Sequence, residues 1–172
     1  FDMRQRFAGT ATWTLPGRHA LARNFELRGI FTVQSGQPFS PYLRFDNSNT
    51  GNTGGTFGYD RPDLVGDPQL GSKTPQRWFN PAAFAVPAPF TFGNSGRNIL
   101  TGPALATVDS SVARVFAIQE RYRLTASFEA FNLLNRTNFQ LPERFLDEPS
   151  TFGRILSARP PRQLQLSLRL QF

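Results

Sequence analysis

The last ten residues, Gln163-Leu164-Gln165-Leu166-Ser167-Leu168-Arg169-Leu170-Gln171-Phe172, alternate strictly between polar and apolar side chains. Successive side chains of a β-strand point to opposite faces, so one face would carry a row of leucines ending in Phe172, and the other only polar residues. A helix with this sequence would be apolar on all sides. The alternation therefore predicts a strand over residues 163–172.

Four other segments alternate in the same way, near residues 6–15, 25–33, 108–116 and 122–131. The weakest is 108–116, where Ser110 and Arg114 interrupt the apolar face, and we expect a bulge or a snorkelling arginine there. A strand of ten residues tilted by about 40° rises about 25 Å, the height of the apolar band of an outer-membrane barrel. Strands of soluble domains are usually nearer five or six residues.

Short and long connections between these segments alternate along the chain. Residues 16–24 and 117–121 form the short ones, and residues 34–107 and 131–162 the long ones. Outer-membrane barrels combine short periplasmic turns with long extracellular loops. We therefore expect an all-β fold, an antiparallel up-and-down transmembrane β-barrel, here as a C-terminal fragment of about five strands. Residues 34–107 are expected to form a flexible outer loop.

Aromatic residues end the apolar faces beside the short connections and at the last residue: Trp13, Phe25, Phe116, Tyr122 and Phe172. Aromatic girdles mark the membrane interfaces of such barrels, so these five are predicted to face lipid. Charged residues lie on the opposite faces, which we expect to line the lumen: Glu26, Arg28, Asp109, Arg123, Glu129 and Arg169. A wall of paired, hydrated charges is the simplest role for them, and a substrate path is the alternative.

The composition argues against an enzyme. Cysteine is absent, the single histidine, His19, falls in an expected turn, and the carboxylates show no catalytic pairing. Residues 46–52 resemble the start of a calcium loop, but Phe57 stands where a closing glutamate is needed, so we expect no metal. We expect no cofactor either.

The net charge of +7 raises the question of a nucleic-acid partner. The arginines, however, are scattered singly and form no basic run, so we expect no nucleic-acid binding.

Seven short stretches, in order along the chain, resemble the late barrel strands and loops of TonB-dependent outer-membrane receptors of the Oar-like group. They are Phe1–Phe7, Gln34–Phe39, Arg61–Pro68, Trp78–Phe84, Phe92–Asn98, Glu129–Asn135, and Phe152–Ile155 followed by Pro161–Gln163. The resemblance implies an outer-membrane receptor with a plug inside a barrel of roughly 22 strands. Such receptors take up nutrients with energy passed on by TonB. We expect the plug domain to be absent from these residues.

The resemblance also implies partners. The end of the chain, with Leu166, Leu168, Leu170 and Phe172, resembles the signal read by the barrel assembly machinery. The other implied partners are membrane lipid, the rest of the receptor (its plug and upstream strands), and TonB through that remainder. The transported ligand is not identified by the sequence.

Two other functions remain open from the sequence. A soluble secreted β-sandwich that binds, for example, glycans would also alternate with period two, but it needs the leucines of residues 164–170 in a protein core. An adhesin or a porin without TonB coupling would share the barrel and differ in the upstream region.

Overall fold

The computed structural model describes residues 3–16, 24–54, 58–118 and 121–172. The chain divides into two compact units. Unit 1 comprises Phe1–Arg4, Gly36–Ala104 and Phe139–Ala158, and unit 2 comprises Gln5–Ser35, Leu105–Asn138 and Arg159–Phe172. In the described part of the chain, no helix combines the length and the apolar character needed to cross a bilayer.

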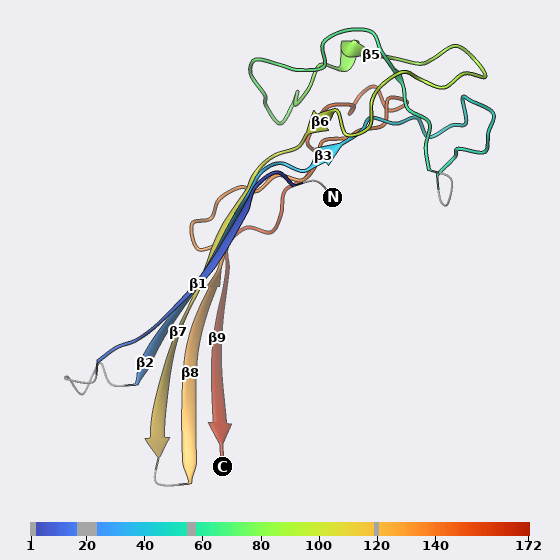
Figure 1. Ribbon diagram of the computed structural model, residues 1–172. Coiled ribbons are helices and arrows are strands. Elements are labelled where there is room, and N and C mark those ends of the chain that lie inside the picture. The colour runs from blue at the N-terminus through green and yellow to red at the C-terminus, as the bar shows by residue number, and fades with distance from the viewer. Residues whose placement is uncertain (1–2, 17–23, 55–57, 119–120) are drawn as a thin grey trace. The chain divides into compact units, whose positions relative to one another are not determined.

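Unit 2 is a five-stranded antiparallel sheet in which each strand pairs with the next one along the chain (Figure 1). Its strands are β1 (Arg6–Thr14), β2 (Phe25–Gln34), β7 (Leu105–Ile118), β8 (Tyr122–Phe131) and β9 (Gln163–Gln171). All five alternating segments form strands, so the prediction of an antiparallel all-β fold is confirmed.

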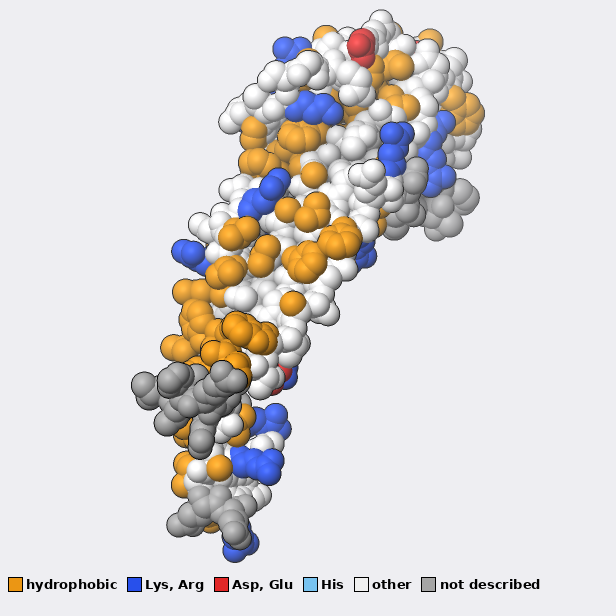
Figure 2. All heavy atoms as spheres, turned by 60° about the vertical axis from the view of Figure 1, so that its left-hand side comes forward, with side chains coloured by type: hydrophobic (Ala, Val, Ile, Leu, Met, Phe, Trp, Pro, Cys, Tyr) orange, Lys and Arg blue, Asp and Glu red, His pale blue; other side chains and the backbone are white. Residues whose placement is uncertain are grey.

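The register of the sheet joins the apolar faces of neighbouring strands. Phe31 lies opposite Val108, and Val112 opposite Phe128. Phe128 in turn lies opposite Leu166. Directly paired residues of an antiparallel sheet share a face, so the five apolar faces form one continuous surface, and Figure 2 shows hydrophobic side chains gathered over the sheet. A slip of one residue would turn a strand's apolar side chains to the wrong face.

Strand β7 differs from its prediction in two ways. It is 14 residues long, and it pairs one-to-one with β2 over Leu105–Arg114 and with β8 over Ser110–Ile118. Of the two alternatives predicted for this strand, a bulge or a snorkelling arginine, the bulge is therefore wrong. Arg114 stays on the apolar face, where its guanidinium carbon lies 4.9 Å from the ring centre of Phe25 and 4.7 Å from that of Phe116. Stacking on two aromatic rings accommodates the charge without an extra residue in the strand.

The first and last strands of the sheet each have an open side. Among the described residues, β1 pairs with β2 alone and β9 with β8 alone. An open edge presents backbone N–H and C=O groups that can form hydrogen bonds with a further strand.

Unit 1 contains little regular structure. Strand β3 (Pro38–Phe39) pairs with β6 (Leu100–Thr101), β4 (Asp63–Leu64) pairs with β5 (Phe84–Ala85), and one 3₁₀-helix, η1, spans Pro81–Ala83. Hydrogen bonds between loops connect the remaining segments, for example from Tyr42 N to Arg144 O at 2.9 Å.

An aromatic core organises unit 1. Phe79 lies at its centre, with its ring centre 6.0 Å from that of Phe39, 5.8 Å from that of Phe84 and 5.0 Å from that of Phe152. Leu100 is buried in the same cluster. The sequence predicted a flexible loop over 34–107. The described residues of Gly36–Ala104 instead form one compact unit with Phe139–Ala158, and this core lies within it. Gln34 ends β2, and residues 105–107 begin β7.

Candidate functional site

The residues predicted to form the assembly signal lie in a row on the apolar face of β9. The leucine side chains of this row are largely bare: Leu166 is 82% exposed, Leu168 76% and Leu170 54%. Phe172, directly after the strand, is 95% exposed. Apolar side chains that are this accessible indicate a surface made to contact something other than water.

The predicted girdle residues gather at one end of the sheet. That end is defined by three pairs, Thr14 with Glu26, Ile118 with Tyr122, and Arg123 with Gln171. The strand ends that lead into the two short connections lie there, together with the end of β9. The girdle residues all lie within a few positions of this end and on the apolar side: Trp13, Phe25, Phe116, Tyr122 and Phe172. Their contact with lipid stays a prediction.

The residues predicted to line a lumen share the opposite face: Glu26, Arg28, Asp109, Arg123, Glu129 and Arg169. Arg28 forms an ion pair with Glu26, and the Asp109 carboxylate accepts a hydrogen bond of 2.8 Å from Asn132 N. A hollow of about 240 Å³ is lined by Arg28, Asp109 and Glu129 among others. One ion pair, between Arg28 and Glu26, therefore forms on this face, and its role as the wall of a lumen stays a prediction.

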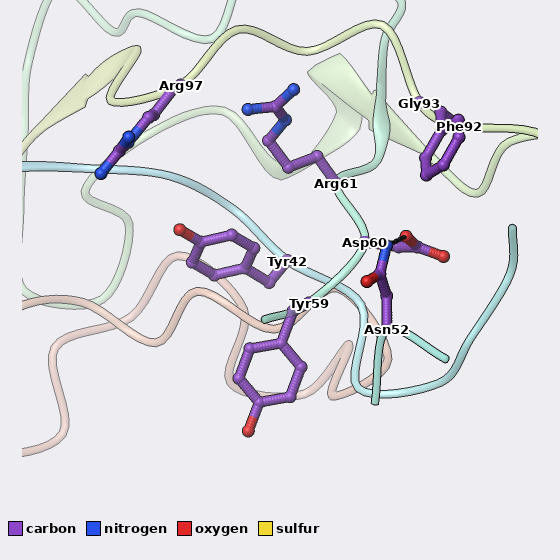
Figure 3. Close-up of a pocket in the computed structure, with 8 residues that line it drawn as sticks. All are labelled: Tyr42, Asn52, Tyr59, Asp60, Arg61, Phe92, Gly93 and Arg97. Carbon is purple, nitrogen blue, oxygen red and sulfur yellow. Dashed lines mark hydrogen bonds between the residues drawn. The ribbon is translucent and has the colours of Figure 1, made fainter. Parts of the chain in front are cut away.

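A second hollow lies in unit 1 and was not predicted from the sequence. Its volume is about 370 Å³ (Figure 3). It is lined by Tyr42, Asn52, Tyr59, Asp60, Arg61, Phe92, Gly93 and Arg97. We call it the unit 1 pocket.

Asp60 acts as a structural group beside this pocket. It is 2% exposed, and its carboxylate accepts hydrogen bonds from Ser48 N at 2.7 Å, Ser48 Oγ at 3.0 Å and Asn52 Nδ2 at 2.8 Å. These three hydrogen bonds satisfy the acceptor atoms of the buried carboxylate. Asp60 therefore holds the 46–52 loop in place.

An aromatic cluster supports the tyrosine side of the pocket. The ring centres of Tyr42 and Tyr59 are 5.8 Å apart, and Phe145 lies 6.5 Å from Tyr42 and 5.2 Å from Tyr59. The Arg144 guanidinium carbon stands 5.3 Å from the Tyr42 ring centre. Contacts of this kind keep the position of Tyr42 well defined.

The two arginines of the pocket lack the polar partners that some other arginines of unit 1 have. Arg44 pairs with Glu148 at 3.0 Å, and Arg154 donates to Ser150 O. Within the described ranges, neither Arg61 nor Arg97 donates a side-chain hydrogen bond or forms an ion pair. In Figure 3 the Arg61 side chain reaches toward Arg97, and the Tyr42 hydroxyl is directed into the same part of the pocket.

The segment that resembled the start of a calcium loop is an acid-capped turn. Asp46 accepts hydrogen bonds from Thr50 N at 3.0 Å, Gly51 N at 2.6 Å and Ser48 Oγ at 3.3 Å. Burial is the largest single influence on the pKa of Asp46 and raises it. The hydrogen bonds, from Gly51 first, together outweigh burial and bring the pKa below its usual value. Phe57, where a closing ligand would be needed, and His19 lie outside the described residues.

The pocket residues escaped sequence reasoning because they are far apart along the chain. A usable signal existed in the stretches Arg61–Pro68 and Phe92–Asn98, which were noted for their family resemblance. These two stretches meet at the pocket, where they contribute Arg61, Phe92, Gly93 and Arg97.

The chain was compared with protein families, with curated proteins and with solved structures. The model of a family described as "Outer membrane beta barrel domain" matches residues 1–165. No curated protein matches the chain, and no solved structure matches it.

Proposed function

This chain belongs to the outer membrane beta barrel domain family, and on that premise we propose that it is the C-terminal barrel segment of a TonB-dependent receptor for nutrient uptake. The family places the protein in the bacterial outer membrane. The step from a barrel protein to an energised receptor is the proposal.

The observation that carries the proposal is the organisation of unit 1. The two long connections of the barrel segment fold around one aromatic core and form a pocket of about 370 Å³. A passive pore has no need of such a pocket, whereas a receptor must hold a scarce ligand before transport. The seven stretches that resemble TonB-dependent receptors support the same assignment.

Membrane lipid is the proposed partner of the apolar face of the sheet. The exposed leucines of β9 and the aromatic residues at one end of the sheet suit hydrocarbon and interface respectively. The opposite face then lines the lumen. The short connections face the periplasm and the long ones the outside.

The remaining proposed partners are proteins or protein segments. The open edges of β1 and β9 suit further strands of the same barrel. The barrel assembly machinery reads the row that ends in Phe172. TonB acts through the plug, and the proposal contains no enzymatic step, no cofactor and no nucleic acid.

The soluble β-sandwich is not favoured by the structure. It required Leu164, Leu166, Leu168 and Leu170 in a protein core, but all four are at least half exposed. In the described residues the only sheet of more than two strands is the one that carries them.

The test of the proposed function uses living cells. The gene that encodes this chain is deleted, growth is measured on a panel of limiting nutrients, and the same panel is run on cells that lack TonB. We expect the deletion to impair growth on particular nutrients, and the loss of TonB to impair growth on those same nutrients. Normal growth of the TonB-deficient cells on those nutrients would contradict the proposal and favour a porin. Loss of surface attachment with normal growth would favour an adhesin.

A further inference from the structure

The unit 1 pocket offers hydrogen-bond donors and few free acceptors. A guanidinium carries five N–H donors, and those of Arg61 and Arg97 have no protein acceptor among the described residues. The Tyr42 hydroxyl likewise has no hydrogen-bond partner there. The one lining carboxylate, Asp60, already accepts three hydrogen bonds from Ser48 and Asn52. The ligand that satisfies this pocket must therefore bring acceptors.

The charge of the lining favours a monoanion. Two arginines and one aspartate line the pocket, which leaves one positive charge. Each guanidinium is a planar fork that matches the two oxygens of a carboxylate. A single carboxylate on the ligand therefore neutralises the net positive charge of the lining, and its two oxygens can accept hydrogen bonds from a guanidinium.

The aromatic residues favour a ring next to the carboxylate. The Tyr42 ring is held by Tyr59 and Phe145, and Phe92 is 65% exposed at the other side of the pocket. Flat aromatic faces bind sugar rings and aromatic rings through apolar contact. The volume of about 370 Å³ lies at the small end of the range for ligand pockets, where a single ring or a pair of rings fits.

Two local features hold the pocket in shape. A Cβ atom on Gly93 would overlap the carbonyl oxygens of Arg61 and Pro62. The backbone of Gly93 is therefore in direct contact with the backbone of the Arg61–Pro62 segment. On the Phe92 side, Asn47 Nδ2 donates to Ala88 O at 3.0 Å and to Thr91 O at 2.9 Å. Both walls are therefore fixed before a ligand arrives, which lowers the cost of binding.

We propose that the unit 1 pocket binds a small ligand in which a carboxylate is attached to a ring, with Arg61 and Arg97 on the carboxylate and Tyr42 and Phe92 against the ring. The inference rests on the proposed receptor function for its biological meaning. Two natural sources share this chemistry, acidic sugars and aromatic acids, and the experiment separates them.

The experiment measures direct binding to the whole 172-residue chain, folded in detergent micelles, by titration calorimetry. The probes form two matched pairs, galacturonate with galactose and 4-hydroxybenzoate with 4-hydroxybenzyl alcohol, because each pair differs at the carboxylate. Inorganic phosphate serves as an anion without a ring. We expect one of the two carboxylates to bind, its neutral partner and phosphate to bind at least tenfold more weakly, and the affinity to fall as salt is raised.

Three variants test the assignment of residues. Arg61→Gln and Arg97→Gln each remove a proposed carboxylate partner, and each is expected to weaken binding about tenfold or more. Arg77→Gln is the matched control, since it removes the same charge from an exposed arginine of unit 1 outside the pocket lining. It should change the affinity less than twofold. Near-ultraviolet circular dichroism checks folding, and Arg97, which is the more exposed of the two, keeps the test valid if the Arg61 variant misfolds.

Each result decides the question. Binding of galacturonate identifies an acidic-sugar site, and binding of 4-hydroxybenzoate an aromatic-acid site. Equal binding of a neutral partner or of phosphate overturns the inference, as does a folded chain that binds neither carboxylate or an Arg97→Gln variant of full affinity. Because the assay needs no TonB, failed binding beside TonB-dependent growth overturns only this inference, whereas binding without TonB-dependent growth overturns only the proposed function.

Discussion

The turn that carries Phe90 shows how single residues shape unit 1. Phe90 has a φ angle of 62°, a left-handed conformation that is strained for a bulky residue, and its side chain is 75% exposed. Its amide donates to Asn47 O at 2.8 Å, and the Asn47 side chain bonds both Ala88 and Thr91. The strain at Phe90 is thus held by the hydrogen bonds of Asn47.

Replacing Asn47 tests this account. Asn47→Ala removes both side-chain hydrogen bonds, so the turn is expected to relax, unit 1 to lose about 1–3 kcal/mol of stability, and Phe92 to leave the pocket. Denaturant unfolding followed by near-ultraviolet circular dichroism measures the loss. Asn52→Ala, which leaves the Phe90 turn intact, is the control for the position of Phe92. An unchanged unfolding midpoint in Asn47→Ala would contradict the role given to this side chain.

The lowered pKa of Asp46 predicts that the stability of unit 1 depends on pH. Its pKa is below the ordinary value in the folded chain, so the charged form is favoured by folding. The stability that it contributes is fully present above the ordinary carboxyl pKa of about 3.9 and is lost as the pH falls through the lower folded value. Asp46→Asn should therefore destabilise unit 1 at pH 7 and have a much smaller effect near pH 2.

The measurement for Asp46 is the difference in denaturation midpoint between the natural chain and the variant at both pH values. Taking a difference removes the contribution of the other carboxylates. A difference that stays constant with pH would show that the hydrogen bonds from Thr50 and Gly51 do not depend on the charge.

At the scale of the strand, the two faces of β9 differ in polarity. Leu166 lies opposite Phe128 on the apolar face, and its neighbour Gln165 lies opposite Glu129 on the polar face. The two positions are adjacent in sequence and equally part of the strand. Only their side differs.

A charge placed at these two positions should have unequal effects. Leu166→Arg is expected to cost about 2–4 kcal/mol of stability in lipid, because an arginine on the lipid side of a barrel must be buried in hydrocarbon. Gln165→Arg should cost little, since it faces water and Glu129. Urea unfolding of the chain in lipid vesicles gives both values. Equal costs at the two positions would mean that the apolar face does not contact lipid.

The aromatic core of unit 1 predicts a second unequal effect. Phe79→Ala empties the centre of the Phe39, Phe84 and Phe152 cluster and should destabilise unit 1 by about 3–5 kcal/mol. The far-ultraviolet signal of the sheet should change little, because the sheet lies in unit 2. Limited proteolysis within residues 36–104 reports the loss of unit 1. Simultaneous loss of the sheet would show that the two units unfold as one.

At the scale of the whole molecule, the sheet carries both an exposed apolar face and two open edges. Among the described residues, strands β1 and β9 each have one edge that pairs with no other strand, and the leucine side chains of β9 are exposed. Water hydrates the apolar face at a high cost, and the open edges can pair with strands of other chains. The chain by itself is therefore expected to aggregate in water and to remain dispersed in detergent.

Size-exclusion chromatography with light scattering checks this behaviour in the presence and absence of detergent. A monodisperse species without detergent would contradict the lipid-facing assignment of the sheet. Leu166→Gln with Leu168→Gln offers a graded comparison, since it shortens the apolar row without altering the edges and should reduce, but not abolish, aggregation.

The sequence by itself determined the strands of unit 2 and their two faces. Alternation with period two is a local property, because each strand's own backbone sends successive side chains to opposite sides. The approximate places of the strands, and the face of each girdle and lumen residue, therefore followed from short stretches of sequence, although β7 extends beyond its predicted limits at both ends. The family resemblance also followed from the sequence, from seven short stretches taken together in their order along the chain.

Only the tertiary structure decided the rest. Arg114 is stacked on Phe25 of the neighbouring strand, a contact that depends on register and that replaced the predicted bulge. The sequence shows no periodic spacing that links the residues of the core around Phe79. The same holds for the pocket around Tyr42, Arg61 and Arg97. Their association arises from contacts between distant segments of the chain, and the period of the side chains within one segment does not predict such contacts.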